Sequence, residues 1–186
     1  FDYVTINVSS PNTKNLRDLQ KPETLEKILK EVNNINVSLK RKVPIFIKIA
    51  PDLNDGNVTE ILSVCEENNV SGLIATNTTI NPKTLKNPNS FKGGLSGKPL
   101  YNQSNKILRL LAKRKKDSTV LIGVGGIFSA AEIYEKIMMG ASAVQIYTSF
   151  IYNGPTHIKK MEIELKNLLL NDGYGSINEA VGGLIR

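Results

Sequence analysis

The sequence has little cysteine and little histidine, which limits the chemistry open to it. Among 186 residues there is one cysteine, Cys65, and one histidine, His157. A single cysteine cannot form an internal disulfide, so the chain is not a disulfide-stabilised scaffold. Cys65 falls at helical spacing with Val58, Ile61 and Leu62, which predicts a place in the core. No spacing of His, Cys and carboxylate residues suggests a metal site, and His157 is predicted to lie at the surface.

Long apolar runs and a concentrated charge are lacking as well. No run reaches the roughly 18 apolar residues that span a bilayer, and the chain opens on a strand-like segment rather than on a signal peptide. The 24 basic and 17 acidic residues give a net charge of +7, spread along the whole chain without interleaved aromatic residues. This pattern disfavours nucleic-acid binding. A first residue other than Met suggests a fragment or a processed chain.

What the sequence does contain is an alternation of short β-branched runs with longer amphipathic ones. Hydrophobic residues make up 40% of the chain, enough for the packed core of a single domain. The runs typical of buried strands are 4–8, 44–49, 72–76, 120–123 and 143–147. A segment with helical periodicity follows each of them. Ser129-Ala130-Ala131-Glu132 is a predicted capping box for a helix that Gly140 closes.

Five nearly apolar strands, each followed by a helix, predict an α/β fold with a parallel sheet covered by helices. A doubly wound sheet and a (β/α)8 TIM barrel both fit this count. Polar residues and glycines follow every strand rather than one switch point, which favours the barrel. Barrels commonly hold phosphate after strands seven and eight, and here Gly123-Val124-Gly125-Gly126 and Tyr147-Thr148 follow the last two strands. We therefore expect residues 1–186 to be the C-terminal portion of a barrel, strands 4 to 8.

Several polar residues are candidates for a site at the mouth of such a barrel. Lys48 lies in an otherwise apolar strand, where an unpaired ammonium is costly to bury, so it is expected to face a ligand or a carboxylate unless it reaches the surface. Asn7, Asn12 and Asn77 carry amides suited to a planar ligand with N–H and C=O groups, although asparagine also favours turns. The glycines lack the G-x-G-x-x-G spacing of a dinucleotide loop and fit a mononucleotide phosphate better.

Together these residues carry a specific resemblance. The segments 7–13, 48–53, 76–79, 93–100, 123–127 and 145–148 resemble the class 2, quinone-linked dihydroorotate dehydrogenases, in the order of that family and over nearly the whole chain. The resemblance implies an FMN-dependent barrel enzyme. Such an enzyme oxidises dihydroorotate to orotate in pyrimidine biosynthesis and passes the electrons to ubiquinone.

The resemblance also implies roles for single residues. Ser10 matches the base that takes the C5 proton of dihydroorotate, where class 1 enzymes have Cys, and Thr13 with a water is the matching proton relay. Matches to residues that hold the substrate are Asn7, Asn12, Asn77 and Thr78. Matches to residues that contact FMN are Asn7, Lys48, Thr76, Gly97, Gly125, Gly126, Tyr147 and Thr148, with Gly126, Tyr147 and Thr148 around the phosphate. Lys48 would stabilise the anionic reduced flavin.

The same resemblance sets expectations beyond this chain. The family's first three strands and its N-terminal helical pair, which forms the quinone entrance and the membrane anchor, are not present in the sequence. We expect membrane contact through that part, at the mitochondrial inner membrane, or at a bacterial membrane if the source is prokaryotic. Two alternatives stay open: a phosphate-binding barrel aldolase with Lys48 as Schiff-base amine, and an inactive truncated fragment.

Overall fold

The computed structural model describes residues 1–81 and 93–185. Its frame is a five-stranded sheet with the strand order β1-β2-β3-β4-β5, in which all neighbouring strands are parallel. The strands are β1 (Val4–Asn7), β2 (Ile45–Ile49), β3 (Gly72–Ala75), β4 (Val120–Val124) and β5 (Ala143–Gln145). Because each strand pairs with the strands before and after it, the order has no reversal. This excludes the doubly wound sheet and is the order of consecutive barrel strands.

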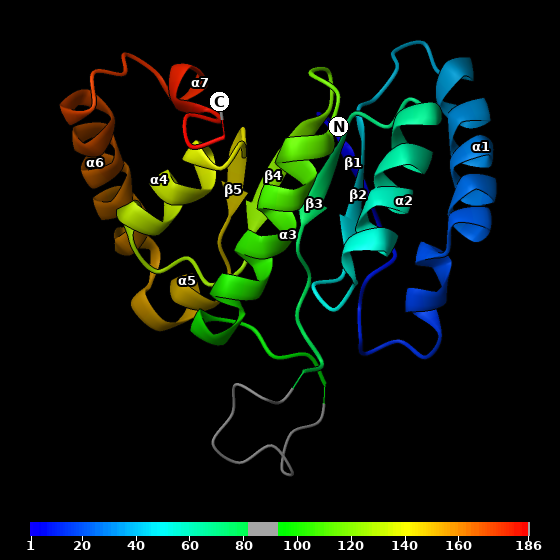
Figure 1. Cartoon of the computed structure of the whole chain (residues 1–186), viewed down its shortest axis with the longest axis horizontal. Helices are drawn as coiled ribbons and strands as arrows, with labels where there is room; N and C mark the ends of the chain where they lie inside the picture. The colour runs from blue at the N-terminus through cyan, green and yellow to red at the C-terminus, as the bar shows by residue number, and fades with distance from the viewer. Residues whose placement is uncertain (82–92, 186) are drawn as a thin grey trace.

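Helices connect the strands and lie side by side across the sheet (Figure 1). They are α1 (Pro22–Ser38), α2 (Asp55–Glu67), α3 (Tyr101–Arg114), α4 (Ala130–Met138), α5 (Thr148–Asn153), α6 (Pro155–Asn171) and α7 (Ile177–Ala180), with 3-10 helices η1 (Leu16–Gln20) and η4 (Lys98–Leu100). The predicted fifth strand, 143–147, is too long by two residues. The backbone leaves the extended conformation at Tyr147, and α5, which the sequence pattern did not reveal, begins at the next residue.

The two faces of the sheet pack differently. Alternate strand residues such as Ile47 and Leu73 join the main core with the apolar faces of α1, α2 and α3. Cys65 is fully buried in that core, as predicted, and burial together with the charge of Glu66 raises the pKa of its thiol to about 12. On the second face, Phe46 and its neighbours form a small cluster of strand side chains alone. That face corresponds to the interior of a barrel.

The predicted capping of α4 is confirmed with one difference. Ser129 Oγ accepts a hydrogen bond from Glu132 N at 3.4 Å, and the carboxylate of Glu132 accepts one from Phe128 N instead of Ser129 N. After the helix, Gly140 has φ 108°, and its N–H donates to Ile137 O at 2.8 Å. The bonds of Ser129 and Glu132 fix the direction in which the chain enters α4 after strand β4, and the bond of Gly140 closes the other end of the helix.

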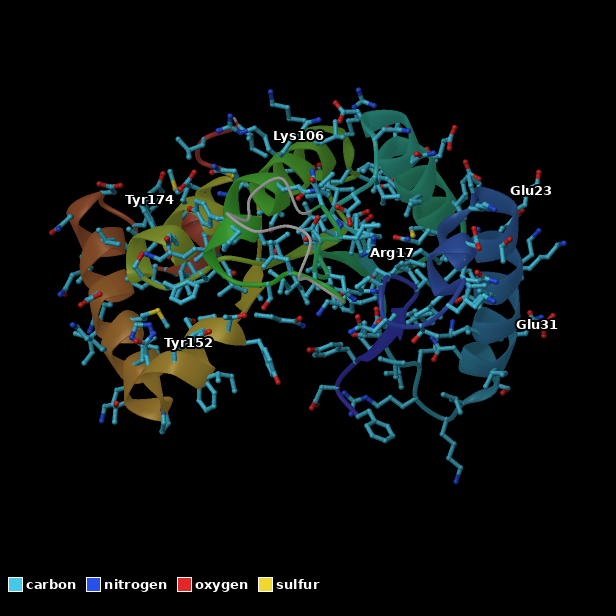
Figure 2. All side chains as sticks on the ribbon, turned by 90° about the horizontal axis from the view of Figure 1, so that it is seen from below. Arg17, Glu23, Glu31, Lys106, Tyr152 and Tyr174 are labelled. Atoms are coloured by element: carbon cyan, nitrogen blue, oxygen red, sulfur yellow. The ribbon has the colours of Figure 1, made fainter. Side chains whose placement is uncertain are left out.

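The carboxyl ends of the strands meet at one edge, at the bottom of Figure 1, and Figure 2 looks onto this edge from below. The long connection predicted from Thr78 to about Asn102 begins here, and its residues 82–92 lie outside the described residues. The described remainder forms an antiparallel bridge between Thr79 and Leu95, followed by η4. Over residues 1–81 and 93–185, none of the helices combines the length and the hydropathy that crossing a bilayer requires.

Candidate active site

A pocket of about 220 Å³ opens at the carboxyl ends of β2 to β5. Parallel strands bring the segments that follow them to one edge, so residues far apart in sequence become neighbours there. Nine of the residues predicted from the sequence line this pocket: Lys48, Thr76, Asn77, Thr78, Gly97, Gly125, Gly126, Tyr147 and Thr148. The structure therefore brings these nine residues together at one mouth, and their roles remain predictions.

Lys48 is the only charged residue among the described residues that line this pocket. Its Nζ lies 3.4 Å from Gln145 Oε1, across the second face of the sheet from β2 to β5. Of the two expected surroundings, a ligand or a carboxylate, no carboxylate partner is seen for Lys48 among the described residues: it faces the pocket, and its hydrogen-bond partner is a neutral amide. Burial lowers the pKa of Lys48, because few groups compensate the ammonium for lost water. Sequence reasoning missed Gln145, although it is, like Lys48, a polar residue in a strand-like run.

The glycine segment after β4 forms the floor of the same pocket. Gly125 and Gly126 have φ of 116° and 76°, and a Cβ on Gly126 would lie 2.7 Å from Tyr101 Cα. A side chain is excluded there, so the backbone approaches the pocket closely just before α4 begins. Such a segment can present backbone N–H groups to an anion. Thr148 and Ser96 line the pocket too, and Thr148 Oγ1 donates to Ser96 Oγ at 2.9 Å, a second contact that the sequence did not reveal.

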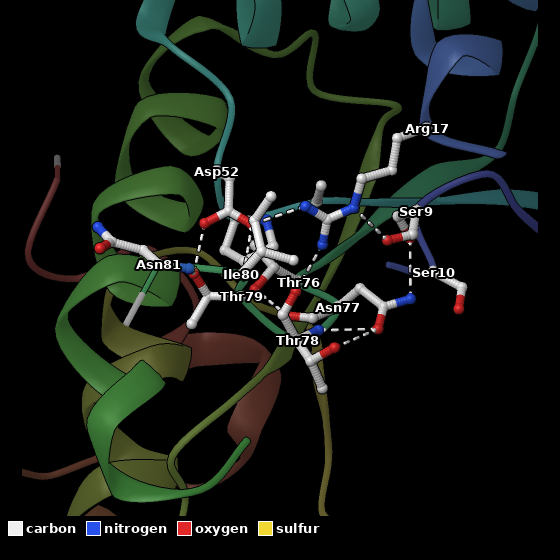
Figure 3. A network of polar contacts seen from close by, with 12 residues as sticks. Ser9, Ser10, Arg17, Asp52, Thr76, Asn77, Thr78, Thr79, Ile80 and Asn81 are labelled. Atoms are coloured by element: carbon white, nitrogen blue, oxygen red, sulfur yellow. Dashed lines mark hydrogen bonds and ion pairs between the residues drawn. The ribbon is translucent and has the colours of Figure 1, made fainter. Parts of the chain in front are cut away.

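A network of amides joins the loops after β1 and β3 (Figure 3). Asn77 Nδ2 donates to Asn7 Oδ1 and to Ser9 Oγ, both at 3.1 Å, and Ser9 Oγ donates to Asn7 Oδ1 at 2.9 Å. Asn77 Oδ1 in turn accepts from Thr78 N at 2.8 Å. Asn7 does not line the pocket itself, but this network connects it to Asn77, which does.

Ser10 and Thr13 line a second, slightly smaller cavity. They line a cavity of about 210 Å³ with Arg17, Asp18 and their neighbours, outside the 220 Å³ pocket. Ser10 Oγ accepts a hydrogen bond from Asn12 N at 3.3 Å. Figure 3 shows the side chain of Ser10 pointing away from the amide network. The structure thus brings the predicted base and its relay residue together and separates them from the residues around Lys48. Asn12 is exposed on the same loop.

An ion pair that sequence reasoning missed ties three of these loops together, and we call it the Arg17–Asp52 clamp (Figure 3). Arg17 donates to Asp52 Oδ2 and to Thr78 O, both at 2.8 Å, and to Ser9 O at 3.0 Å. The two side chains are 20% and 18% exposed, so water weakens the pair only in part. No local pattern reveals the clamp, because it depends on the folded positions of three loops.

The carboxylate of Asp52 is held by several donors. It accepts from Ile80 N and Gln103 Nε2 at 3.1 Å and from the hydroxyl of Thr79. Burial alone raises the pKa of Asp52, but the hydrogen bonds from Thr79, Ile80, Arg17 and Gln103 outweigh burial and lower the pKa below its usual value. Asp52 is therefore a stable anion that fixes the loop after β3.

The sequence predicted that the single histidine lies at the surface, but the structure places it in a partly buried position. His157 is half-buried, and its Nε2 lies 3.0 Å from the carbonyl oxygen of Phe128, a residue that lines the 220 Å³ pocket. The sequence gave no sign of this partner, which comes from the loop before α4. In the described ranges, no group of three or more His, Cys, Asp or Glu side chains is placed to hold a metal ion.

Comparison with known proteins assigns this chain to a family. A family model described as dihydroorotate dehydrogenase matches residues 1–169. The chain belongs to the dihydroorotate dehydrogenase family. It is 45% identical over 182 residues to a dihydroorotate dehydrogenase (quinone) of Cereibacter sphaeroides, covering 97% of this chain and 51% of the relative. A dihydroorotate dehydrogenase (quinone) of Christiangramia forsetii is 48% identical over 163 residues, covering 86% of this chain and 48% of the relative. The predicted resemblance to class 2 is confirmed.

Solved structures agree with the fold as well. The crystal structure of a dihydroorotate dehydrogenase from Eimeria tenella in complex with ferulenol superposes with a TM-score of 0.94 at 36% identity, covering all of this chain and 55% of that one. The ligand-free form from the same organism gives the same TM-score at 37% identity. The five strands are thus part of a (β/α)8 barrel, as predicted. The chain spans about half the length of the curated relatives it matches.

Proposed function

We propose that this chain supplies the C-terminal five strands of a quinone-linked dihydroorotate dehydrogenase. The observation that carries the proposal is one pocket lined by a glycine segment, the half-buried Lys48 and Asn77 of the amide network, in a chain of this family. Residues 1–186 would then be the C-terminal portion of the barrel. The other strands and the quinone entrance would lie in a part of the protein outside this chain.

The hydrogen-bond donors and the positive charge around the pocket match the groups of flavin mononucleotide. The side-chain-free approach at Gly125 and Gly126 suits a phosphate, and Tyr147 and Thr148, which carry hydroxyl groups, line the same pocket. Lys48 places a single positive charge on the barrel-interior face, where the isoalloxazine ring would lie. When bound, FMN supplies an acceptor for the hydride that leaves C6 of dihydroorotate.

The chain's own residues would bind the substrate and move its proton. Asn7, Asn77 and Thr78 would hold the ring and carboxylate of dihydroorotate, with Asn12 at the mouth. Ser10 would take the C5 proton. Its hydroxyl is a weak base, and the cavity that it shares with Thr13 has room for a water that could carry the proton onward.

Ubiquinone as electron acceptor and contact with a membrane belong to this proposal too. Both would depend on a segment outside this chain. The two curated relatives described above are bacterial, so a bacterial membrane is the setting that we propose, and the mitochondrial inner membrane stays a prediction without support from them. Membership of the dehydrogenase family disfavours the aldolase alternative.

The test uses the full-length protein, made from the complete gene that contains this sequence. We expect purified protein to be yellow, and its flavin absorbance to bleach when dihydroorotate is added without oxygen. Adding a soluble ubiquinone should restore the absorbance. A colourless protein, or a flavin that stays oxidised with dihydroorotate, would contradict the proposed function. Borohydride trapping of an aldehyde on Lys48 would instead support the aldolase.

Replacing Lys48 with alanine should slow flavin reduction by roughly 10²-fold, because one preorganised charge beside the reacting group is removed. The pKa of Lys48 is lowered by burial, so its ammonium is lost earlier than usual as pH rises. We therefore expect the wild-type rate to fall at alkaline pH and the Lys48→Ala rate to lack this fall. Stopped-flow absorbance measures both. Lys160→Ala, an exposed lysine on α6 that pairs with Glu164, is the control. Equal rates for wild type and Lys48→Ala would remove Lys48 from the site.

A further inference from the structure

The largest fully buried side chain among the described residues belongs to a lysine, Lys136 on α4. Its Nζ donates to Ser104 Oγ at 3.0 Å and to Asn105 Oδ1 at 2.6 Å, and it lies 5.3 Å from the centre of the Tyr101 ring. These partners are neutral. Burying an ammonium without an anion is costly, and an apolar side chain of similar size would avoid the cost. The burial of Lys136 is therefore not explained by a contribution to the stability of the protein without its ligand.

Lys136 lies directly behind the glycine segment of the pocket. A Cβ on Gly123 would be 3.0 Å from Lys136 Cδ, so the lysine stem packs against the end of β4. Ser104, which accepts from Lys136, also donates to Val124 O, and its Cβ lies 3.1 Å from the Cβ position of Gly125. Val124 and Gly125 line the 220 Å³ pocket on their other side. One serine and one turn of backbone therefore separate the ammonium from the proposed phosphate position.

The acidic groups near Lys136 are already engaged with other donors. Glu135 accepts from the hydroxyl of Tyr101, and Glu132 accepts from Phe128 N. Both carboxylates favour the charged lysine, but burial outweighs them and lowers the pKa of Lys136 to about 8. The pKa of Tyr101 is raised by burial and by Glu135, so this hydroxyl stays protonated. Near pH 8, Lys136 is thus the group behind the segment that gains or loses a proton.

We propose that Lys136 is a buried counter-charge for the phosphate of the cofactor, acting through Ser104 and the glycine segment without touching the ligand. The proposal rests on the FMN site of the proposed function. Lys48 is the only charged residue that lines the pocket in the described part of the chain, and Lys98 and His157 contact Phe128 of its lining. Lys136 is the lysine that packs against the end of β4, behind the glycine segment. Lys136 is therefore a positioning residue, and its effect should depend on the phosphate alone.

The test compares FMN with riboflavin, which has the same ring and no phosphate. Apoprotein of the full-length chain is titrated with each ligand, and quenching of flavin fluorescence gives the dissociation constants. In Lys136→Met, which keeps the length of the side chain, we expect FMN to bind about 10- to 100-fold more weakly and riboflavin to bind as in wild type. Lys106→Met, an exposed lysine on α3, is the matched control and should change neither constant.

A second measurement needs no variant. Phosphate should raise the pKa of Lys136, so FMN binding takes up a proton above pH 8, and the preference for FMN over riboflavin should fall as pH rises from 8 to 9.5. The counter-charge proposal would be overturned if Lys136→Met lost affinity for FMN and riboflavin equally, or if the preference for FMN over riboflavin did not change with pH. Lys136 would then have a packing role only. If wild-type protein binds neither flavin, the proposed function fails together with this inference.

Discussion

Replacing Ser10 with alanine is expected to slow the reduction of bound flavin by dihydroorotate by about 10²- to 10⁴-fold, the usual contribution of general base catalysis. FMN should stay bound, because Ser10 lies outside the pocket that contains Lys48 and the glycine segment. Stopped-flow absorbance of the full-length protein gives the reduction rate, and the flavin spectrum after gel filtration gives cofactor retention.

Two further variants make this test specific for proton transfer. Ser10→Cys supplies a group with an ordinary pKa of about 8.5, so its rate should rise with pH through that range, unlike the rate of Ser10→Ala. Ser63→Ala changes an exposed serine on α2 and should leave the rate unchanged. A Ser10→Ala protein that reduces its flavin at the wild-type rate would remove Ser10 as the base.

Breaking the Arg17–Asp52 clamp is expected to lower both the stability of the protein and its rate of flavin reduction. Arg17→Met removes the donor to Ser9 O and Thr78 O and leaves the carboxylate of Asp52 without its cation. We expect the free energy of unfolding to fall by about 1–3 kcal/mol, the cost of leaving a partly buried polar group unpaired. The rate of flavin reduction should fall as well, because the loops that carry Ser10 and Thr78 lose their common anchor, whereas FMN affinity should change little.

Two comparisons separate a loss of positioning from a loss of stability. Arg17→Lys keeps a positive charge but cannot reach three acceptors at once, so it should regain part of the stability and little of the rate. Arg114→Met removes an arginine that donates to Thr59 between two helices, and should lower stability without changing the rate at a temperature where it is folded. A normal rate in Arg17→Met would show that the clamp has no part in the reaction.

The pH dependence of the unfolding free energy tests whether the clamp stabilises the ionised form of Asp52. The pKa of Asp52 is lowered in the folded protein, so its contribution to stability is fully present above the ordinary pKa of about 3.9 and is lost as pH falls through the lowered pKa. Arg17→Met weakens one of the bonds that lower this pKa. The difference in unfolding free energy between wild type and Arg17→Met should therefore shrink as pH falls toward 3. Urea unfolding at several pH values measures it.

Much of the site follows from the sequence because each prediction uses a signal within a few residues. A lysine among isoleucines indicates that Lys48 has a special environment, and glycines just before a capping serine predict an anion site near Gly126. Gln145 carries the same kind of signal as Lys48, a polar residue in a strand-like run, and was missed although the strand itself was predicted. Lys48 was expected to face a ligand or a carboxylate; it lines the pocket and its side-chain partner is the amide of Gln145, which a strand pattern cannot reveal because it says nothing about the side chain opposite.

The sequence by itself determined the alternation of strands and helices, the buried positions and the residues gathered at the carboxyl ends of the strands. These depend on local periodicity and on the direction of parallel strands. Only the tertiary structure decided which side chains meet: Arg17 and Asp52 lie 35 residues apart, Lys136 and Ser104 lie 32 apart, and Lys48 and Gln145 lie 97 apart. Such contacts depend on the twist and register of the sheet and on the packing of helices. A polar residue in a sequence pattern shows that it needs a partner, and the fold alone supplies that partner.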